Sequence, residues 1–315
     1  MPPLALIHPP NIIWKEALEN LTAYTGALRN LCQQPFTNAQ LQSAVQDVVN
    51  AKSLIHQRIT KDNVLILDRV KLREKIELVS LDTTALKVLL VRGSRQSGKS
   101  HGRHLMHSAA LDRGAVFVYL TSGMVANVKN VIDRLFSAFG ALRDVPAIYT
   151  TDIAGYNAVC NKLQDVAMEK NKQMWIAVDD LGLDPDGVPL LSSDIKEFFD
   201  QFALLLTDPS FSAWFRLMLI HYPEGKLPTK WKRDVFTQDH TSETDVQQGD
   251  VADVLRAWSA ARGRNMMEKD LLELAADVIT NAEAVPPPGE EEVSRLQRIN
   301  DELRKTLDDL ALQNP

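Results

Sequence analysis

Gly93 to Ser100 is the stretch whose residue types and spacing point most clearly to chemistry. It reads GSRQSGKS and fits the pattern G-x-x-x-x-G-K-[ST] at every position. Glycines let the backbone curl until successive N–H groups point inward, and such a concave loop binds phosphate oxygens. The lysine adds a charge that reaches the β- and γ-phosphates, and the final serine offers a hydroxyl to Mg²⁺. The alternative is a glycine-rich turn that carries a lysine by chance.

The segments on both sides favour phosphate binding over chance. The aliphatic stretch 85–93 predicts a strand, and 99–114 predicts a helix that Gly114 closes. That helix would direct its positive N-terminal end at the same phosphates. The predicted nucleotide-binding residues of this stretch are Gly93, Ser94, Gln96, Ser97, Gly98, Lys99, Ser100 and His101. Lys99 is also predicted to be catalytic, and Ser100 to be a Mg²⁺ ligand.

A second polar site follows the apolar stretch MWIAV at 174–178. A phosphate-binding loop of this type needs an acidic partner at the end of another strand to hold Mg²⁺. Asp179 is predicted to be this metal carboxylate. Asp180 is predicted to orient or deprotonate the attacking water, and its alternative role is to cap the turn DDLGLDPDG. A strand and several helices separate Lys99 from Asp179, which suits a sheet with another strand inserted between the two motif strands.

Apolar strands alternate with helices through the middle of the chain. Strands are expected at 85–93, 115–121, 174–180 and 214–222, and helices at 127–140, 153–170 and 192–208. This alternation predicts an α/β fold, a P-loop NTPase parallel sheet with helices on both faces. Beyond residue 226 we expect helices and no further strand.

The predicted organisation has four parts. An N-terminal helical hairpin (1–62) precedes the P-loop NTPase core (63–225), and a C-terminal helical lid (226–285) follows it. The last part (286–315) is a proline-rich acidic linker and a helix with apolar residues spaced as in a coiled coil. That helix is expected to pair with a partner helix or to pack onto its own domain.

These motifs resemble the STAND branch of P-loop NTPases, which are relatives of AAA+ proteins. LILDRVKLREKI (65–76) is similar to the STAND segment beside adenine and ribose, which implies that Asp68 and Arg69 border the nucleotide. The alternative is an ordinary helix start with Asp68 as its N-cap. The resemblance also implies that His221, after the fourth strand, senses the γ-phosphate; alternatively it is a hydrogen-bonded polar residue without this role.

The resemblance implies a minimal family member. No GxP motif follows the core, and we expect no full winged-helix domain or long repeat sensor. Compact bacterial members of this type belong to conflict or antiphage systems and work beside separate effector chains. Some of them hydrolyse ATP weakly or not at all.

Three functions are consistent with these features. The first is an ATP- and Mg²⁺-dependent switch that controls self-assembly or recruitment of a protein partner through its helical termini. The second is a DNA-associated AAA+-type ATPase, a transposition or loading factor that grips nucleic acid with the basic loop 226–233 around Trp231; that loop is alternatively only solvated. The third is a nucleotide-binding scaffold without turnover. ATP is favoured over GTP because no guanine-reading N-K-x-D segment is present.

Net charge, cysteine spacing and the length of the apolar runs indicate the environment in which we expect the protein to act. The formal net charge is -6 and the pI is near 5.7, which argues against a surface that coats nucleic acid generally. Cys32 and Cys160 show no CxxC spacing, so we expect reduced thiols. The first residues lack a basic segment and no apolar run reaches membrane-spanning length, so we expect a cytoplasmic protein without membrane contact.

Overall fold

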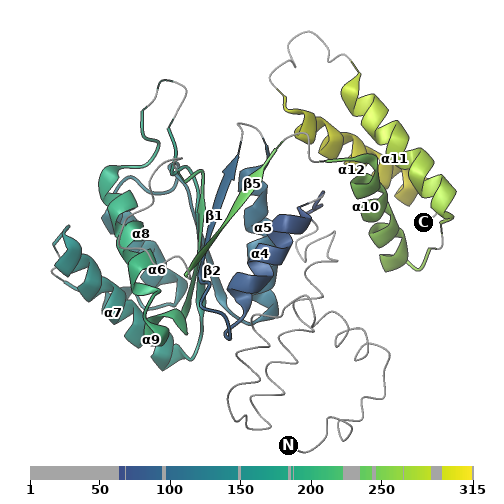
Figure 1. Ribbon diagram of the computed structural model, residues 1–315. Coiled ribbons are helices and arrows are strands. Elements are labelled where there is room, and N and C mark those ends of the chain that lie inside the picture. Colours follow the sequence, from purple (N-terminus) through teal and green to yellow (C-terminus); the bar gives the residue numbers. More distant parts are fainter. Residues whose placement is uncertain are drawn as a thin grey trace, which may run out of the picture.

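The computed structural model in Figure 1 describes residues 64–67, 69–93, 97–147, 150–183, 186, 188–222, 235–242, 246–264, 266–284 and 293–313. Several sequence-based expectations lie outside these residues. They concern the N-terminal hairpin, Asp68, Ser94, Gln96, the basic loop 226–233 and most of the acidic linker.

The described residues form a five-stranded sheet in the order β2-β3-β4-β1-β5, with every neighbouring pair parallel. The strands are β1 (Val88–Gly93), β2 (Val116–Leu120), β3 (Met174–Val178), β4 (Phe215–Ile220) and β5 (Phe236–Thr241). The predicted α/β class with a parallel sheet is confirmed. The expected insertion is confirmed too, because β4 lies between β1 and β3.

Helices cover both faces of the sheet, as Figure 1 shows. One face packs against α6 (Val128–Ala138), α7 (Ile153–Lys170), α8 (Ser193–Leu205) and the short α9 (Pro209–Ser212). The other face packs against α4 (Val70–Ser80) and α5 (Gly102–Asp112). Buried side chains on β1, β3 and β4 alternate between the two cores, which explains why these strands read as continuous apolar runs. Two 3₁₀ turns complete this part, η3 (Lys99–His101) and η4 (Leu142–Asp144).

The expectation that no strand follows residue 226 is wrong. β5 pairs with β1 in parallel from Phe236 opposite Val88 to Thr241 opposite Gly93. It reads FTQDHT, and only Asp239 and Thr241 are buried within it. An edge strand half open to solvent needs no aliphatic run, so its sequence carries no strong strand signal.

A third apolar cluster joins the C-terminal helices α10 (Gln248–Ala261), α11 (Glu268–Glu283) and α12 (Arg295–Gln313). Leu65 and Leu67, from the segment before α4, belong to the same cluster. Ile299 and Leu303 of α12 are fully buried in it, so α12 packs onto its own domain, the second of the two predicted arrangements. Across the described part of the chain, every helix is too short or too polar to traverse a lipid bilayer.

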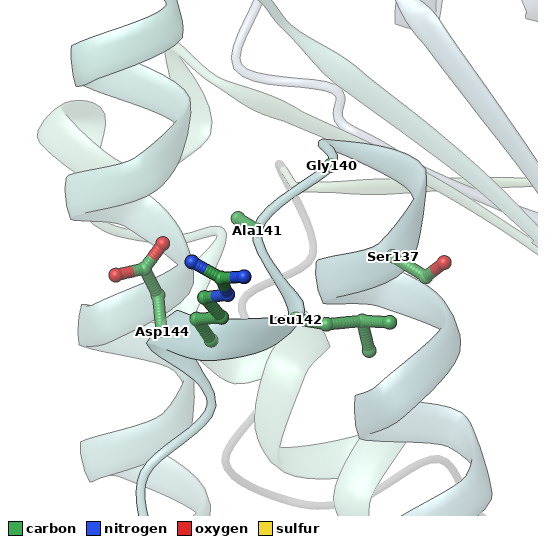
Figure 2. Close-up of a pocket in the computed structure, with 6 residues that line it drawn as sticks. Ser137, Gly140, Ala141, Leu142 and Asp144 are labelled. Carbon is green, nitrogen blue, oxygen red and sulfur yellow. The ribbon is translucent and has the colours of Figure 1, made fainter.

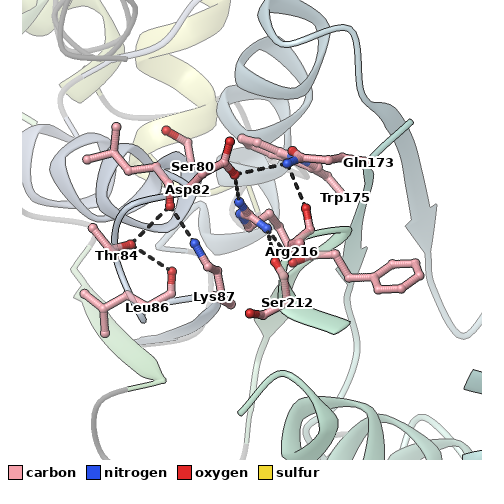
Figure 3. A network of polar contacts seen from close by, with 12 residues as sticks. Ser80, Asp82, Thr84, Leu86, Lys87, Gln173, Trp175, Ser212 and Arg216 are labelled. Carbon is pink, nitrogen blue, oxygen red and sulfur yellow. Dashed lines mark hydrogen bonds and ion pairs between the residues drawn. The ribbon is translucent and has the colours of Figure 1, made fainter. Parts of the chain in front are cut away.

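A polar network lies where β3 and β4 begin (Figure 3). The Arg216 guanidinium, fully buried at the start of β4, forms an ion pair with Asp82 and donates to the Ser212 carbonyl at 2.6 Å. Gln173 Nε2 donates to the same Asp82 carboxylate at 3.0 Å. The loop after α4 is therefore tied to the strand starts at the edge of the sheet opposite to the strands' carboxyl ends.

Replacing Asp82 with alanine should destabilise the fold, because the buried Arg216 charge loses its anionic partner. We expect the free energy of unfolding in urea to fall by about 1–2 kcal/mol, less than the ~3–5 kcal/mol of a fully buried pair. The smaller value follows from the 53% exposure of the Asp82 side chain, which lets water replace part of the interaction. Asp144→Ala, at an exposed position of η4, is the control; equal losses in both variants would contradict this role of Asp82.

Candidate nucleotide-binding site

β1 ends at a glycine whose conformation and surroundings exclude a side chain. Gly93 has φ +139°, and a Cβ there would lie 2.0 Å from the Thr241 carbonyl oxygen of β5. Thr241 also places its Oγ1 2.8 Å from Oγ of the fully buried Ser97. The unpredicted strand β5 therefore anchors both the start and a later residue of the predicted phosphate loop.

Lys99 lies inside this loop. Its ammonium donates to the Gly93 carbonyl at 3.1 Å and to Ser97 Oγ at 3.4 Å. Burial lowers the pKa of Lys99, while the negative charge of Asp179 opposes the shift and the nearby Arg69 adds to it. The cation is thus held by oxygens of the loop itself, next to the carboxylate predicted to share the site.

The carboxylate of Asp179, 1% exposed, is the centre of the site. Its Oδ1 accepts from His221 Nδ1 at 2.7 Å and from the Asp180 N–H at 2.8 Å, and its Oδ2 accepts from the Tyr119 hydroxyl at 3.0 Å. The Ser100 side chain lies close to it and helps to lower its pKa. Burial raises the pKa of Asp179, but the hydrogen bonds outweigh burial and hold the pKa below its usual range. The group is therefore an anion at neutral pH.

Asp180 and His221 leave their strands with positive φ angles of 62° and 58°. Non-glycine residues seldom adopt this conformation, at a cost of about 1–3 kcal/mol each, and they concentrate at functional sites. The turn directs the Asp180 carboxylate to Ser122, whose hydroxyl donates at 2.7 Å and whose N–H donates at 3.1 Å. It directs the His221 ring onto Asp179.

Arg69 reaches the loop from the segment before α4. It is 6% exposed, and its guanidinium donates to the Ser97 carbonyl. Arg69, with φ 76°, also occupies the N-cap of α4. Arg69 thus lies beside the predicted phosphate loop.

His101 joins the same segment to the start of α5. Its Nε2 lies 2.7 Å from the Leu65 carbonyl, and burial lowers the pKa of the ring. The neutral ring therefore donates to that carbonyl. The side chain of His101 ties the segment before α4 to the loop, while its predicted contact with nucleotide stays a prediction.

The structure brings most described candidates together. Lys99, Ser100 and Asp179 converge, His221 contacts Asp179, and Arg69 contacts the loop at Ser97. Asp180 is adjacent, but its carboxylate is bonded to Ser122 on the side of β2. Its predicted role in orienting water and the predicted γ-phosphate contact of His221 remain predictions.

Sequence reasoning missed Tyr119, Arg103 and Thr241. Tyr119 is the polar-tipped residue in the strand VFVYL, and its contact with Asp179 depends on the pairing of β2 with β3. Arg103 is an ordinary position of a predicted helix. Thr241 lies on the strand that was not predicted, so each of these residues needed the tertiary arrangement to be noticed.

The donor set fits Mg²⁺. Ser100 and Asp179 offer a hydroxyl and a carboxylate, the oxygen ligands that Mg²⁺ prefers, and the two side chains lie close to one another. Ligand atoms of Asp179, Asp180 and His221 also lie within 4.8 Å of one another. The residues that would hold the metal are Ser100 and Asp179, as predicted from the sequence.

A surface pocket lies elsewhere, at the end of α6 and the turn η4 (Figure 2). Its lining residues are Ser137, Gly140, Ala141, Leu142, Arg143 and Asp144. None of them belongs to the phosphate loop or to the group around Asp179.

Known proteins offer only remote likenesses. No family model matches the chain, and no curated protein matches it. Solved structures with a similar fold include the Aeropyrum pernix ORC2 protein in its ADP form, 13% identical, over 81% of this chain and 72% of that one, with a TM-score of 0.44. C. elegans PCH-2 is 11% identical over 78% and 71%, with a TM-score of 0.34. The E. coli MS115-1 HORMA:CdnC:Trip13 complex contains a chain that is 11% identical over 71% and 74%, with a TM-score of 0.33.

Replacing Gly93 with alanine should destabilise the fold more than a positive φ angle alone explains. The new Cβ meets the backbone oxygen of Thr241, which cannot rotate away as a side chain can. Gly114→Ala is the matched control, since φ is +65° there and nothing lies within 4 Å of the added carbon. We expect about 1–2 kcal/mol of lost unfolding free energy for Gly114→Ala and at least ~2 kcal/mol more for Gly93→Ala. Equal losses in urea unfolding would show that the approach of β5 imposes no constraint.

Proposed function

We propose that this protein is an ATP-binding and ATP-hydrolysing switch that controls self-assembly or recruitment of a protein partner. One observation carries the proposal: the Ser100 side chain and the Lys99 ammonium of the predicted phosphate loop both lie close to the buried Asp179 carboxylate. Phosphate-binding backbone, a cation and a metal-suited oxygen pair are thereby assembled from strands that β4 separates. A glycine-rich turn with a chance lysine would not require this convergence.

Each residue of the site has its own role in binding a nucleoside triphosphate. The loop N–H groups and Lys99 bind the phosphates, and Arg69 adds positive charge beside them. Ser100 and Asp179 hold Mg²⁺, which neutralises charge on the phosphates when bound. Asp180 is the residue that orients the attacking water, and its carboxylate first has to leave Ser122. The base is adenine, since the sequence lacks a guanine-reading segment.

Contact between α12 and the loop would let nucleotide binding change how the C-terminal helices pack. Leu296 of α12 covers Gly98 so closely that a Cβ at Gly98 would lie 2.3 Å from Leu296 Cδ2. Leu65 and Leu67, beside the predicted base site, share the apolar cluster of α10–α12. Phosphates entering the loop therefore change the surface against which α12 packs. We assign the switch to this contact, and the partner to a protein that binds the lid or the terminal helices.

We place the chain in the STAND branch of P-loop NTPases, with a role in bacterial antiphage conflict as the biological setting. The support is the combination of GSRQSGKS, the tandem Asp179–Asp180 and the segment before α4 whose Arg69 contacts the loop.

Lys99→Ala tests the function directly. Without the ammonium, the loop loses the charge that binds the phosphates, and phosphate release from ATP should fall at least about 100-fold. ATP affinity and the mass in solution with and without ATP–Mg²⁺ are measured together. Lys71→Ala, at an exposed position of α4, is the charge-matched control and should behave as wild type.

ATP binding that survives Lys99→Ala unchanged would contradict the proposal. Binding without phosphate release, unaffected by Asp180→Ala, would select the scaffold without turnover.

Hydrogen exchange of α12 tests the switch. We expect ATP–Mg²⁺ to change deuterium uptake in 295–313 of the wild type, because the nucleotide alters the loop under Leu296. Lys99→Ala should show no such change. The helix α7 is the internal control, because it packs against the face of the sheet that α4 and α5 do not cover. Identical uptake of α12 with and without bound ATP would contradict coupling between loop and lid.

A further inference from the structure

Tyr119 faces the metal site because of strand pairing. It lies on the edge strand β2 opposite Ala177 of β3, and both side chains belong to the face covered by α5. Asp179 follows two residues after Ala177, and its N–H continues the ladder by donating to the Leu120 carbonyl at 2.8 Å. Side chains two residues apart on a strand share a face, so Tyr119 and Asp179 are diagonal neighbours.

The Tyr119 hydroxyl donates to Asp179 Oδ2 at 3.0 Å, while His221 and the Asp180 N–H occupy Oδ1. Both oxygens of the carboxylate are therefore held, which stops its rotation. Burial raises the pKa of Tyr119 and the charge of Asp179 raises it further, so the phenol keeps its proton and donates.

Arg103 of α5 closes this arrangement into a ring. It donates to the Tyr119 hydroxyl at 3.2 Å and to the Ser100 carbonyl at 3.3 Å, and its guanidinium carbon lies 4.3 Å from the centre of the Tyr119 ring. The Ser100 side chain in turn lies close to Asp179 and helps to lower its pKa. The ring runs Ser100, Arg103, Tyr119, Asp179 and back to Ser100. A donor on the phenol oxygen also strengthens the bond that the phenol donates.

We propose that Tyr119 and Arg103 are positioning residues for the metal site: they hold Ser100 and Asp179 at the separation and orientation that a divalent cation needs. This inference rests on the proposed function, since it concerns the Mg²⁺ that accompanies ATP. Residues that orient metal ligands commonly set metal affinity by about 10–100-fold without touching the metal. Tyr119 and Arg103 act in this way, through Asp179 and Ser100.

The test uses Tyr119→Phe, which removes the hydroxyl and keeps the ring under Arg103. Mn²⁺ serves as the spectroscopic probe, titrated with the full chain and a non-hydrolysable ATP analogue and followed by electron paramagnetic resonance. We expect the Mn²⁺ dissociation constant to rise at least about tenfold, and analogue affinity in EDTA to change less than about twofold. Phosphate release should recover at high Mg²⁺, so that the Mg²⁺ requirement changes more than the maximal rate.

Tyr156→Phe is the matched control, because it removes the hydroxyl of a buried tyrosine whose partner is the Asp194 carbonyl in another part of the core. It should leave Mn²⁺ affinity unchanged. Arg103→Lys is a second variant for the Mn²⁺ titration, so the test does not depend on whether Tyr119→Phe folds. The Arg103→Lys substitution keeps the charge but replaces the planar guanidinium, whose Nη1 contacts both partners and which lies over the Tyr119 ring, with a shorter ammonium side chain, so it should also weaken Mn²⁺ binding.

The outcomes separate the two proposals. Wild-type protein that binds no Mn²⁺–analogue complex overturns the proposed function and this inference together. Wild-type binding with unchanged or tighter Mn²⁺ affinity in both Tyr119→Phe and Arg103→Lys overturns the inference alone. Weaker Mn²⁺ binding in either variant, with metal-free analogue affinity and thermal unfolding preserved, supports it.

Discussion

The rest of this site depends on the hydrogen bonds that keep the buried Asp179 carboxylate ionised. Burial of an anion is costly, and Asp179 is almost fully buried. Donors from β2, from the residue after β4 and from the next residue of its own chain offset that cost, and the Ser100 side chain lies close to the same carboxylate. Each of these elements is thereby held at the carboxylate, so the charge that suits a metal also fixes the geometry around it.

The order of the strands decides which residues can gather there. Parallel pairing sends every strand's carboxyl end to one edge, and β4 between β1 and β3 separates the loop from Asp179 by one strand. His221, at the end of β4, fills the intervening position with a hydrogen bond to Asp179. On the other side of β1, the edge strand β5 approaches Gly93 too closely for any side chain and anchors Ser97 through Thr241. The loop is therefore braced on both flanks of its strand.

The C-terminal helices α10, α11 and α12 are connected to the loop through the segment before α4. Three helices share one apolar cluster with the segment before α4, and that segment also bonds His101 and, through Arg69, the loop. Leu296 rests on the second glycine of the motif. Apolar packing is non-directional, whereas the hydrogen bonds of the loop are directional. The segment before α4 is therefore joined to the C-terminal helices by packing, and to His101 and the loop by hydrogen bonds.

The sequence by itself determined the glycine-rich loop after one strand, the acidic residues after another, the apolar strands and the helices, including α7 with the predicted bounds. These features are local: the motif is a run of adjacent residue types, and buried strands or amphipathic helices repeat on their own period. Only the tertiary structure decided the rest. It added β5, whose half-exposed edge position needs no apolar run, and it turned Asp180 toward Ser122 through a left-handed residue. It brought Tyr119 and Leu296 to the site from distant elements and placed Arg103, three residues after Ser100, against Tyr119, because such contacts arise from strand register and helix packing, which no short stretch of sequence encodes.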